Sequence, residues 1–84
     1  MSSASPPRVT PDAIRALMRA RLTVEVPDRG TDLFGAGLLD SLGLIDLFLA
    51  LEETFGIVVV VDEVDFEDFR TLDTITAYVE RRLG

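Results

Sequence analysis

The chain has 84 residues, of which 15 are acidic and 8 are basic, and its formal net charge is −7 at pH 7. A chain this short forms one domain with a single modest core, which argues against an enzyme with an enclosed active site of its own. The acidic balance disfavours binding to nucleic acid or anionic membranes and favours basic patches on partner proteins.

The sequence contains no cysteine and no histidine. Disulfides, thiolate or imidazole metal sites and Ser–His–Asp triads are therefore excluded, and we expect neither catalytic residues nor a metal centre. The N-terminus lacks an apolar signal region, and no apolar run approaches the roughly 20 residues of a membrane span. The expectation is a cytoplasmic monomer.

The chain opens with a small, polar, proline-containing stretch over residues 1–9, which predicts a disordered tail before a single folded domain over residues 10–84. Thr10 followed by Pro11 is a strong helix start, because threonine caps well and proline at the first helical position loses no hydrogen bond. The apolar residues that follow at helical spacing are Ile14, Leu17, Met18 and Leu22. We expect the first helix to run from Pro11 to Leu22.

Residues 23–40 form a long connection for a helical domain, and such length often accompanies function. Four apolar residues within it should fasten it to the core: Leu33, Phe34, Leu38 and Leu39. A second helix is predicted over residues 42–55, and Gly56 is a natural stop.

The five β-branched residues 57–61 have no second strand with which to pair, so we expect an extended segment across the bundle. The acidic residues 62–69 predict a short third helix. Thr71 should cap a last helix that turns Leu72, Ile75, Val79 and Leu83 inward. The fold class predicted is therefore all-α, a four-helix bundle of three longer helices and one short one, with a long loop between the first two.

The helix over residues 42–55 is apolar on more than one face. Its core stripe consists of Leu44, Leu47, Phe48, Leu51 and Phe55. A second stripe, Leu42, Ile45 and Leu49, exceeds the apolar face that a small bundle needs. Flanking acidic residues are Asp46, Glu52 and Glu53. The second stripe either packs under the long loop or forms a partner-docking surface with an acidic rim, and we favour docking.

The run GLLDSLGLIDLFLALEETFGI closely resembles the acyl and peptidyl carrier proteins, whose mark is an Asp-Ser-Leu motif opening a helix. The later LDTITAYVERRL is similar to the last helix of that family, so the resemblance covers roughly residues 10–83. It implies an acyl-carrier-like fold in which a phosphopantetheinyl transferase moves 4′-phosphopantetheine from coenzyme A to Ser41. The arm's thiol would then hold the cargo as a thioester.

The resemblance also assigns roles around Ser41. Asp40 matches the motif aspartate that helps the transferase to dock and to bind its metal, and Leu42, Ile45, Asp46 and Leu49 match the recognition helix. A phosphodiester at Ser41 is also physically reasonable, because the free N–H groups and the positive dipole end of a helix N-terminus favour negative charge. A serine there usually caps its helix, but if Asp40 takes that role the Ser41 hydroxyl is free to point outward.

The stretches LFGAGLLDSLGLIDL and DEVDFEDFRTLDTI look like D-alanyl carrier proteins and the discrete carriers of polyketide and nonribosomal peptide pathways. Gly43 and the run 58–61 depart from many carriers. We therefore expect a stand-alone acyl or aminoacyl carrier of specialised biosynthesis, served by an adenylating ligase, acyltransferase or synthase. A D-alanyl carrier for cell-wall modification is one alternative, and an unmodified interaction module with the carrier fold is another.

The acidic residues 62–68 and the aromatic residues are interpreted as structural features and not as ligand sites. The acidic residues 62–68 lack the spacing and glycine of an EF-hand loop and are interpreted as a solvated face. The aromatic residues predicted to lie in the core are Phe48, Phe55, Phe66 and Phe69, and Tyr78 is interpreted as a helix-packing residue.

Overall fold

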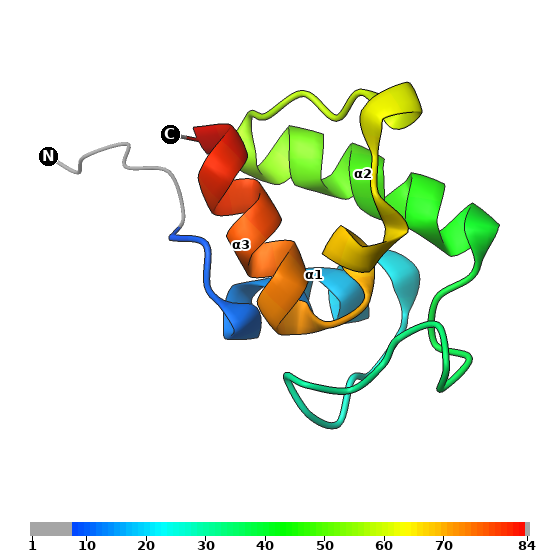
Figure 1. Cartoon of the computed structure of the whole chain (residues 1–84). Coiled ribbons are helices and arrows are strands. Elements are labelled where there is room, and N and C mark those ends of the chain that lie inside the picture. The colour runs from blue at the N-terminus through cyan, green and yellow to red at the C-terminus, as the bar shows by residue number, and fades with distance from the viewer. Residues whose placement is uncertain (1–7, 84) are drawn as a thin grey trace, which may run out of the picture.

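The computed structural model describes residues 8–83. It contains three α-helices, α1 (Pro11–Leu22), α2 (Ser41–Phe55) and α3 (Leu72–Leu83), and two short 3₁₀ turns, η1 (Val61–Glu63) and η2 (Phe66–Phe69) (Figure 1). No strand occurs within that range. The all-α prediction is confirmed. Of the predicted N-terminal tail, residues 1–7 lie outside the described range, and Val9 packs against the core.

The predicted fourth helix is not confirmed, because residues 62–69 do not form one continuous helix. The backbone at Val64 and Asp65 is extended, and the Asp65 carboxylate accepts the Glu67 N–H at 2.9 Å to start η2 separately. Two effects explain the break: carboxylates crowd this stretch at helical spacing, and aspartate competes with the helical backbone by capping locally.

Capping residues set the helix boundaries close to those predicted. Thr10 Oγ1 accepts the Ala13 N–H at 3.0 Å at the start of α1. Gly56 ends α2 with a φ of 72°, in the left-handed region that favours glycine. Thr71 and Thr74 cap α3 reciprocally, each hydroxyl oxygen accepting the other residue's N–H, at 3.1 and 3.0 Å.

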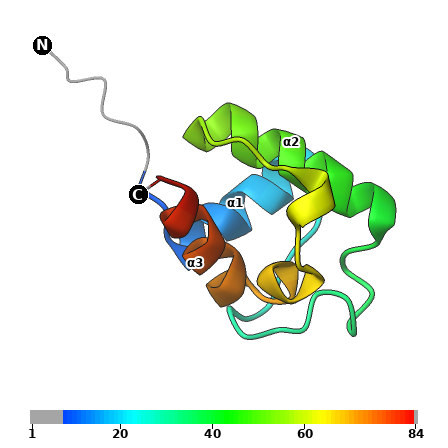
Figure 2. The ribbon, with the colours of Figure 1, turned by 45° about the horizontal axis from the view of Figure 1, so that its top comes forward.

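The core lies where α1 packs against both α2 and α3, with η2 covering α3. Figure 2 shows α1 between the other two helices, with the segment after α2 running back along α2 to η1. Phe69 is fully buried, and its ring lies 5.0 Å from that of Phe48 and 4.8 Å from that of Tyr78. The core placement of Phe48, Phe55 and Phe69 and the packing role of Tyr78 are confirmed.

The prediction of an extended segment over residues 57–61 is confirmed for residues 57–60, whereas Val61 begins η1. Side chains of α2 and α3 supply hydrogen bonds to the segment. Val59 N–H donates to the Glu52 carboxylate at 2.8 Å, and Arg82 donates to the Val58 carbonyl at 3.0 Å. Ile57 and Val59 are buried, whereas Val58 is exposed. The segment thus stays extended without a partner strand.

The long loop is fastened to the start of α3, and this fixes the approach to α2. Leu33 N–H donates to the Arg70 carbonyl at 2.7 Å, and Arg29 donates to Asp73 at 2.8 Å. Leu33 and Leu39 are buried, and the other two predicted anchors are half-buried. The loop is therefore pinned to the core, as the apolar anchors predicted.

Two predicted inward positions are wrong. Leu83 is 48% exposed, because α3 ends beyond the part of the core that could cover it, and Phe66 is 64% exposed.

Within residues 8–83, no helix has the length and apolar character needed to cross a membrane.

Candidate functional site

Ser41 is the first residue of α2, and Asp40 is its N-cap. The Asp40 carboxylate oxygen Oδ1 accepts the Gly43 N–H at 2.8 Å, which satisfies one of the free donors of the first helical turn. Ser41 is exposed, and its hydroxyl makes no hydrogen bond to residues 8–83. The predicted roles of the two residues are confirmed: Asp40 caps the helix, and the Ser41 hydroxyl is therefore left open to solvent.

Gly43 has a packing role that its sequence context did not reveal. A Cβ at this position would lie 3.3 Å from Asp40 Oδ1 and 3.4 Å from Leu39 Cδ1. The contact with Asp40 is tighter than ordinary van der Waals separation and that with Leu39 is at its lower limit, so a side chain would press on the capping carboxylate. Glycine therefore lets the loop close on the first turn of α2 at the cost of roughly 1 kcal/mol in helix propensity.

The second apolar stripe of α2 lies on the surface. Leu42 is 77% exposed, Ile45 is 51% exposed and Leu49 is 50% exposed. The core stripe of the same helix is buried throughout. The alternative in which the second stripe packs under the loop is therefore wrong. Three exposed aliphatic side chains on one helix face form a surface suited to protein contact.

The three acidic residues predicted beside this stripe differ in their surroundings. Asp46 is exposed, Glu53 is exposed but pairs with Arg21 at 2.7 Å, and Glu52 is half-buried. The Glu52 carboxylate holds the Val59 backbone N–H. Asp46 and Glu53 thus present charge to solvent, whereas Glu52 also fastens the extended segment to α2.

An open groove of about 390 Å³ lies beside Ser41. Its lining residues are Phe34, Asp40, Ser41, Leu44, Phe66 and Arg70. The exposed ring of Phe66 stands edge-on to that of Phe34, with 6.1 Å between ring centres. The apolar character of Phe66 predicted a core position, which is wrong. The acidic residues around Phe66 were the only sign in the sequence that it faces solvent.

Arg70 lines the groove and belongs to an ion-pair cluster. Its Nε and Nη2 donate to both carboxylate oxygens of Glu67, at 3.0 and 2.6 Å, and its Nη1 donates to Asp32 at 3.0 Å. The bonds to Glu67 raise the pKa of Arg70 above its ordinary value. The Gly35 N–H, together with the charge of Arg70, lowers the pKa of Asp32. The cluster ties the loop before Ser41 to η2.

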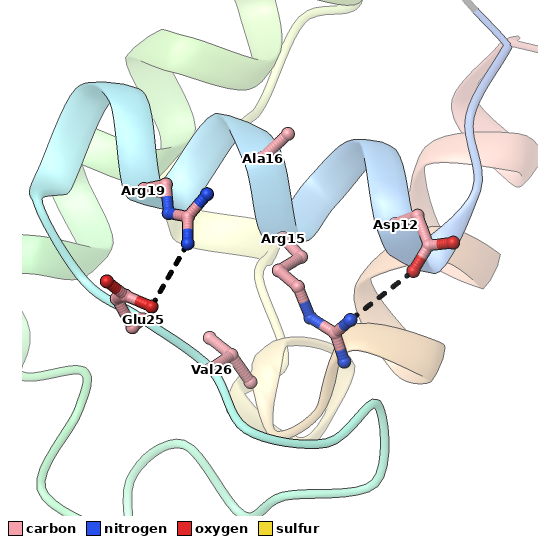
Figure 3. Close-up of a pocket in the computed structure, with 6 residues that line it drawn as sticks. All are labelled: Asp12, Arg15, Ala16, Arg19, Glu25 and Val26. Atoms are coloured by element: carbon pink, nitrogen blue, oxygen red, sulfur yellow. Dashed lines mark hydrogen bonds and ion pairs between the residues drawn. The ribbon is translucent and has the colours of Figure 1, made fainter.

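A second hollow, of about 320 Å³, lies between α1 and the following loop and shares no residue with the groove. Figure 3 shows its polar walls closed by two ion pairs, Arg15 with Asp12 at 3.5 Å and Arg19 with Glu25 at 3.2 Å. Its two cations face two carboxylates, so the hollow offers little net charge to a ligand. Within residues 8–83, no three carboxylates converge as metal ligands do.

A three-helix domain that presents an unbonded serine hydroxyl at a positively polarised helix tip, beside a small groove, has the fold and site of a carrier domain. The family model described as "Phosphopantetheine attachment site" matches residues 12–79, and the chain belongs to this family. Its members carry covalently attached 4′-phosphopantetheine and are not catalysts. The site fits the group, since the exposed hydroxyl can form the ester and the adjoining groove has room for the arm.

The curated relatives include the D-alanyl carrier proteins of Streptococcus pyogenes serotypes M5, M49 and M1, each 47% identical over 49 residues. The matched stretch is 58% of this chain and 62% of each relative. It thus spans less than two thirds of the length of these relatives.

Proposed function

We propose that Ser41 is the residue that carries 4′-phosphopantetheine. A transferase would activate the Ser41 hydroxyl, whose oxygen attacks the β-phosphorus of coenzyme A. The Oγ–P bond forms, the P–O bond to adenosine 3′,5′-bisphosphate breaks, and the serine proton passes to the transferase's base. The observation that carries the proposal is the exposed, unbonded hydroxyl beside the Asp40 cap.

The chain needs no acid, base or metal of its own in this role, because the transferase supplies them. When attached, the arm supplies a thiol that holds acyl groups as thioesters. The phosphodiester would lie at the first turn of α2, where free N–H groups and the helix dipole favour negative charge.

The exposed stripe Leu42, Ile45 and Leu49 is the proposed docking surface for the transferase and for the enzymes that load and unload the arm. Asp46 and Glu53 form its acidic rim, so a partner with an apolar centre and basic edges is complementary. Asp40, the N-cap directly before Ser41, is the proposed contact for the bound transferase and its metal. Glu52 is proposed to support this docking surface indirectly, because its carboxylate holds the extended segment after α2 through the Val59 N–H.

The cargo is proposed to be an amino acid activated by an adenylating ligase, which the likeness to D-alanyl carrier proteins supports. An acyl or aminoacyl cargo in polyketide or nonribosomal peptide biosynthesis is the second candidate. It is favoured by the valine-rich segment, with Val58 64% exposed, where many carriers are more polar. In either case the proposed setting is the cytoplasm, with the chain acting as a monomer.

The attachment is tested by incubating the unmodified protein with a promiscuous phosphopantetheinyl transferase, coenzyme A and Mg²⁺. The intact mass should rise by one phosphopantetheine. Because the chain has no cysteine, a thiol titration should change from no thiol to one per chain. The Ser41→Ala variant should show neither change. Absence of a mass gain with several transferases would refute the proposal.

The cargo and the unmodified-module alternative need separate experiments. Mass spectrometry of the protein from its native host reads the cargo directly, and an alanyl increment on the arm would favour the first candidate. An unmodified module predicts that Ser41→Ala supports the native pathway as well as the wild type does. Loss of the pathway in that variant would exclude the module.

A further inference from the structure

Arg70 holds the loop before Ser41 at two points, one through its side chain and one through its backbone. Its Nη1 donates to the Asp32 carboxylate at 3.0 Å, and its carbonyl accepts the Leu33 N–H at 2.7 Å. Asp32 and Leu33 are neighbours in the chain, so both bonds act on the same place in the loop. Together they fix the orientation of the loop as well as its position.

The bond at Leu33 is linked to the start of α2 through the backbone. The Leu33 carbonyl accepts the N–H groups of Leu38 and Leu39, at 2.9 and 3.1 Å, which closes residues 33–39 into a compact loop. Leu33 and Leu39 are buried in the core. Leu39 directly precedes the N-cap of α2. The backbone that enters α2 is therefore positioned from the distant Arg70.

Arg70 is itself held on its other side. The two carboxylate oxygens of Glu67 accept from its Nε and Nη2, at 3.0 and 2.6 Å. A two-point pair of this kind orients the planar guanidinium group and is stronger than an ordinary exposed ion pair. The next residue, Thr71, caps α3 by accepting the Thr74 N–H at 3.1 Å. Both the side chain and the backbone of Arg70 thus have a fixed base in η2 and α3.

Gly35 shows how closely the loop is built around the Asp32 carboxylate. A Cβ at position 35 would lie 2.6 Å from Asp32 Oδ2, the oxygen that Arg70 binds. A real Cβ atom does not come this close to another heavy atom, so a side chain would displace the carboxylate from Arg70. The backbone gives no reason for glycine here, because Gly35 lacks the positive φ of Gly37 and Gly56.

We propose that Arg70 is a positioning residue for the modification of Ser41, because it fixes the loop over residues 32–39 and so presents the first turn of α2 to the transferase in one conformation. This inference rests on the proposed function, since it needs Ser41 to be the attachment residue. Without Arg70 the loop samples several conformations, and only a fraction of the chains is competent to bind. A fall of that fraction to about one tenth raises the apparent dissociation constant, and with it KM, about tenfold.

The test is steady-state modification of the unmodified full chain by one transferase, with coenzyme A saturating and the concentration of the chain varied. Arg70→Ala should raise KM for the chain about tenfold and leave kcat within about twofold of the wild type. Arg70→Lys keeps the charge but not the planar fork, so it should recover only part of the loss. Gly35→Ala removes neither ion-pairing group and should still raise KM.

Arg29→Ala is the matched control, because Arg29 makes the same two kinds of contact between the long connection and α3. Its Nε donates to the Asp73 carboxylate at 2.8 Å, and its carbonyl accepts the Asp73 N–H at 3.3 Å. Neither contact involves Asp32 or Leu33. Arg29→Ala changes the net charge as Arg70→Ala does, and it should leave KM unchanged.

Amide hydrogen exchange gives a second readout that a loss of overall stability would not reproduce. The amides of Leu38 and Leu39 should exchange faster in Arg70→Ala and Gly35→Ala than in the wild type, while those of α1 exchange at the same rate. Arg29→Ala should leave the exchange of Leu38 and Leu39 unchanged.

The outcomes separate this inference from the attachment itself. Equal effects of Arg70→Ala and Arg29→Ala on KM overturn the positioning role, and so does unchanged exchange at Leu38 and Leu39. If Arg70→Ala does not fold, Gly35→Ala decides, and a wild-type KM in that variant overturns the inference. In each of these cases a mass gain on wild-type Ser41 leaves the attachment intact, whereas its absence refutes both proposals.

Discussion

Replacement of Asp40 by alanine removes the cap of α2. The hydrogen bond from Gly43 N–H to Asp40 Oδ1, 2.8 Å long, is lost, and water replaces it because the helix tip is exposed. Loss of an N-cap costs about 1 kcal/mol, and loss of negative charge at the helix N-terminus adds a few tenths. For a domain of this size each kcal/mol lowers Tm by about 4–8 °C.

The asparagine variant separates the cap from the charge. Asparagine caps about as well as aspartate, so Asp40→Asn should lose only the charge contribution. Its decrease in Tm should be less than half of the decrease caused by Asp40→Ala. The assay is thermal unfolding by circular dichroism in low salt, with modification by a transferase measured in parallel. In Asp40→Ala, Ser41 is the next residue able to cap, which would draw its hydroxyl toward the helix and slow modification.

Equal losses of Tm in Asp40→Asn and Asp40→Ala would refute the capping argument. A further result distinguishes the second role of Asp40. If Asp40→Asn folds like the wild type yet is modified as slowly as Asp40→Ala, the carboxylate acts on the transferase and not only on the helix.

Three further predictions concern stability and docking. Ile45→Ser, on the exposed stripe, should leave the free energy of unfolding within about 1 kcal/mol of the wild type while lowering kcat/KM of partner enzymes. Leu47→Ala, in the core, should lower the free energy of unfolding measured in urea by about 2–5 kcal/mol. The reverse ranking would show that Ile45 belongs to the core. The fold lowers the pKa of Asp32, mainly through the Gly35 N–H, so the ionised carboxylate stabilises the chain above the ordinary pKa of about 3.9 and this contribution is lost as pH falls through the lowered value. The stability gap between wild type and Asp32→Asn should accordingly narrow from pH 7 to pH 2.5, and a constant gap would contradict the sign. Because the net charge is −7 and exposed ion pairs contribute little, moderate salt should raise Tm, and a flat or falling Tm would show that repulsion is not limiting.

The helices could be predicted from the sequence because their signals are local. Thr10 and Thr71 cap through their own side chains, and Gly56 supplies the left-handed residue that stops α2. The two faces of α2 also followed from helical spacing alone. Exposure of Ser41 followed from its neighbour, since an aspartate at position 40 made a second cap unnecessary.

The features that escaped prediction depend on contacts between distant parts of the chain. Phe66 has the hydrophobicity of a core residue, and only the packing of η2 against the long loop shows that it borders a groove. The role of Glu52 depends on the Val59 N–H arriving beside it. Gly43 was noted only as a departure from many carriers, and nothing in the sequence indicated that Asp40 and Leu39 lie close to it.

The central claim is that Ser41 carries the arm, and site-resolved mass spectrometry of the protein from its native host tests it most directly. Tryptic cleavage after Arg29 and Arg70 yields a peptide of residues 30–70, in which Ser41 is the only serine. This peptide should bear the phosphopantetheine mass, and its fragments should place that mass on residue 41. The same mass on Thr31 or Thr54, or on a different peptide, would contradict the account.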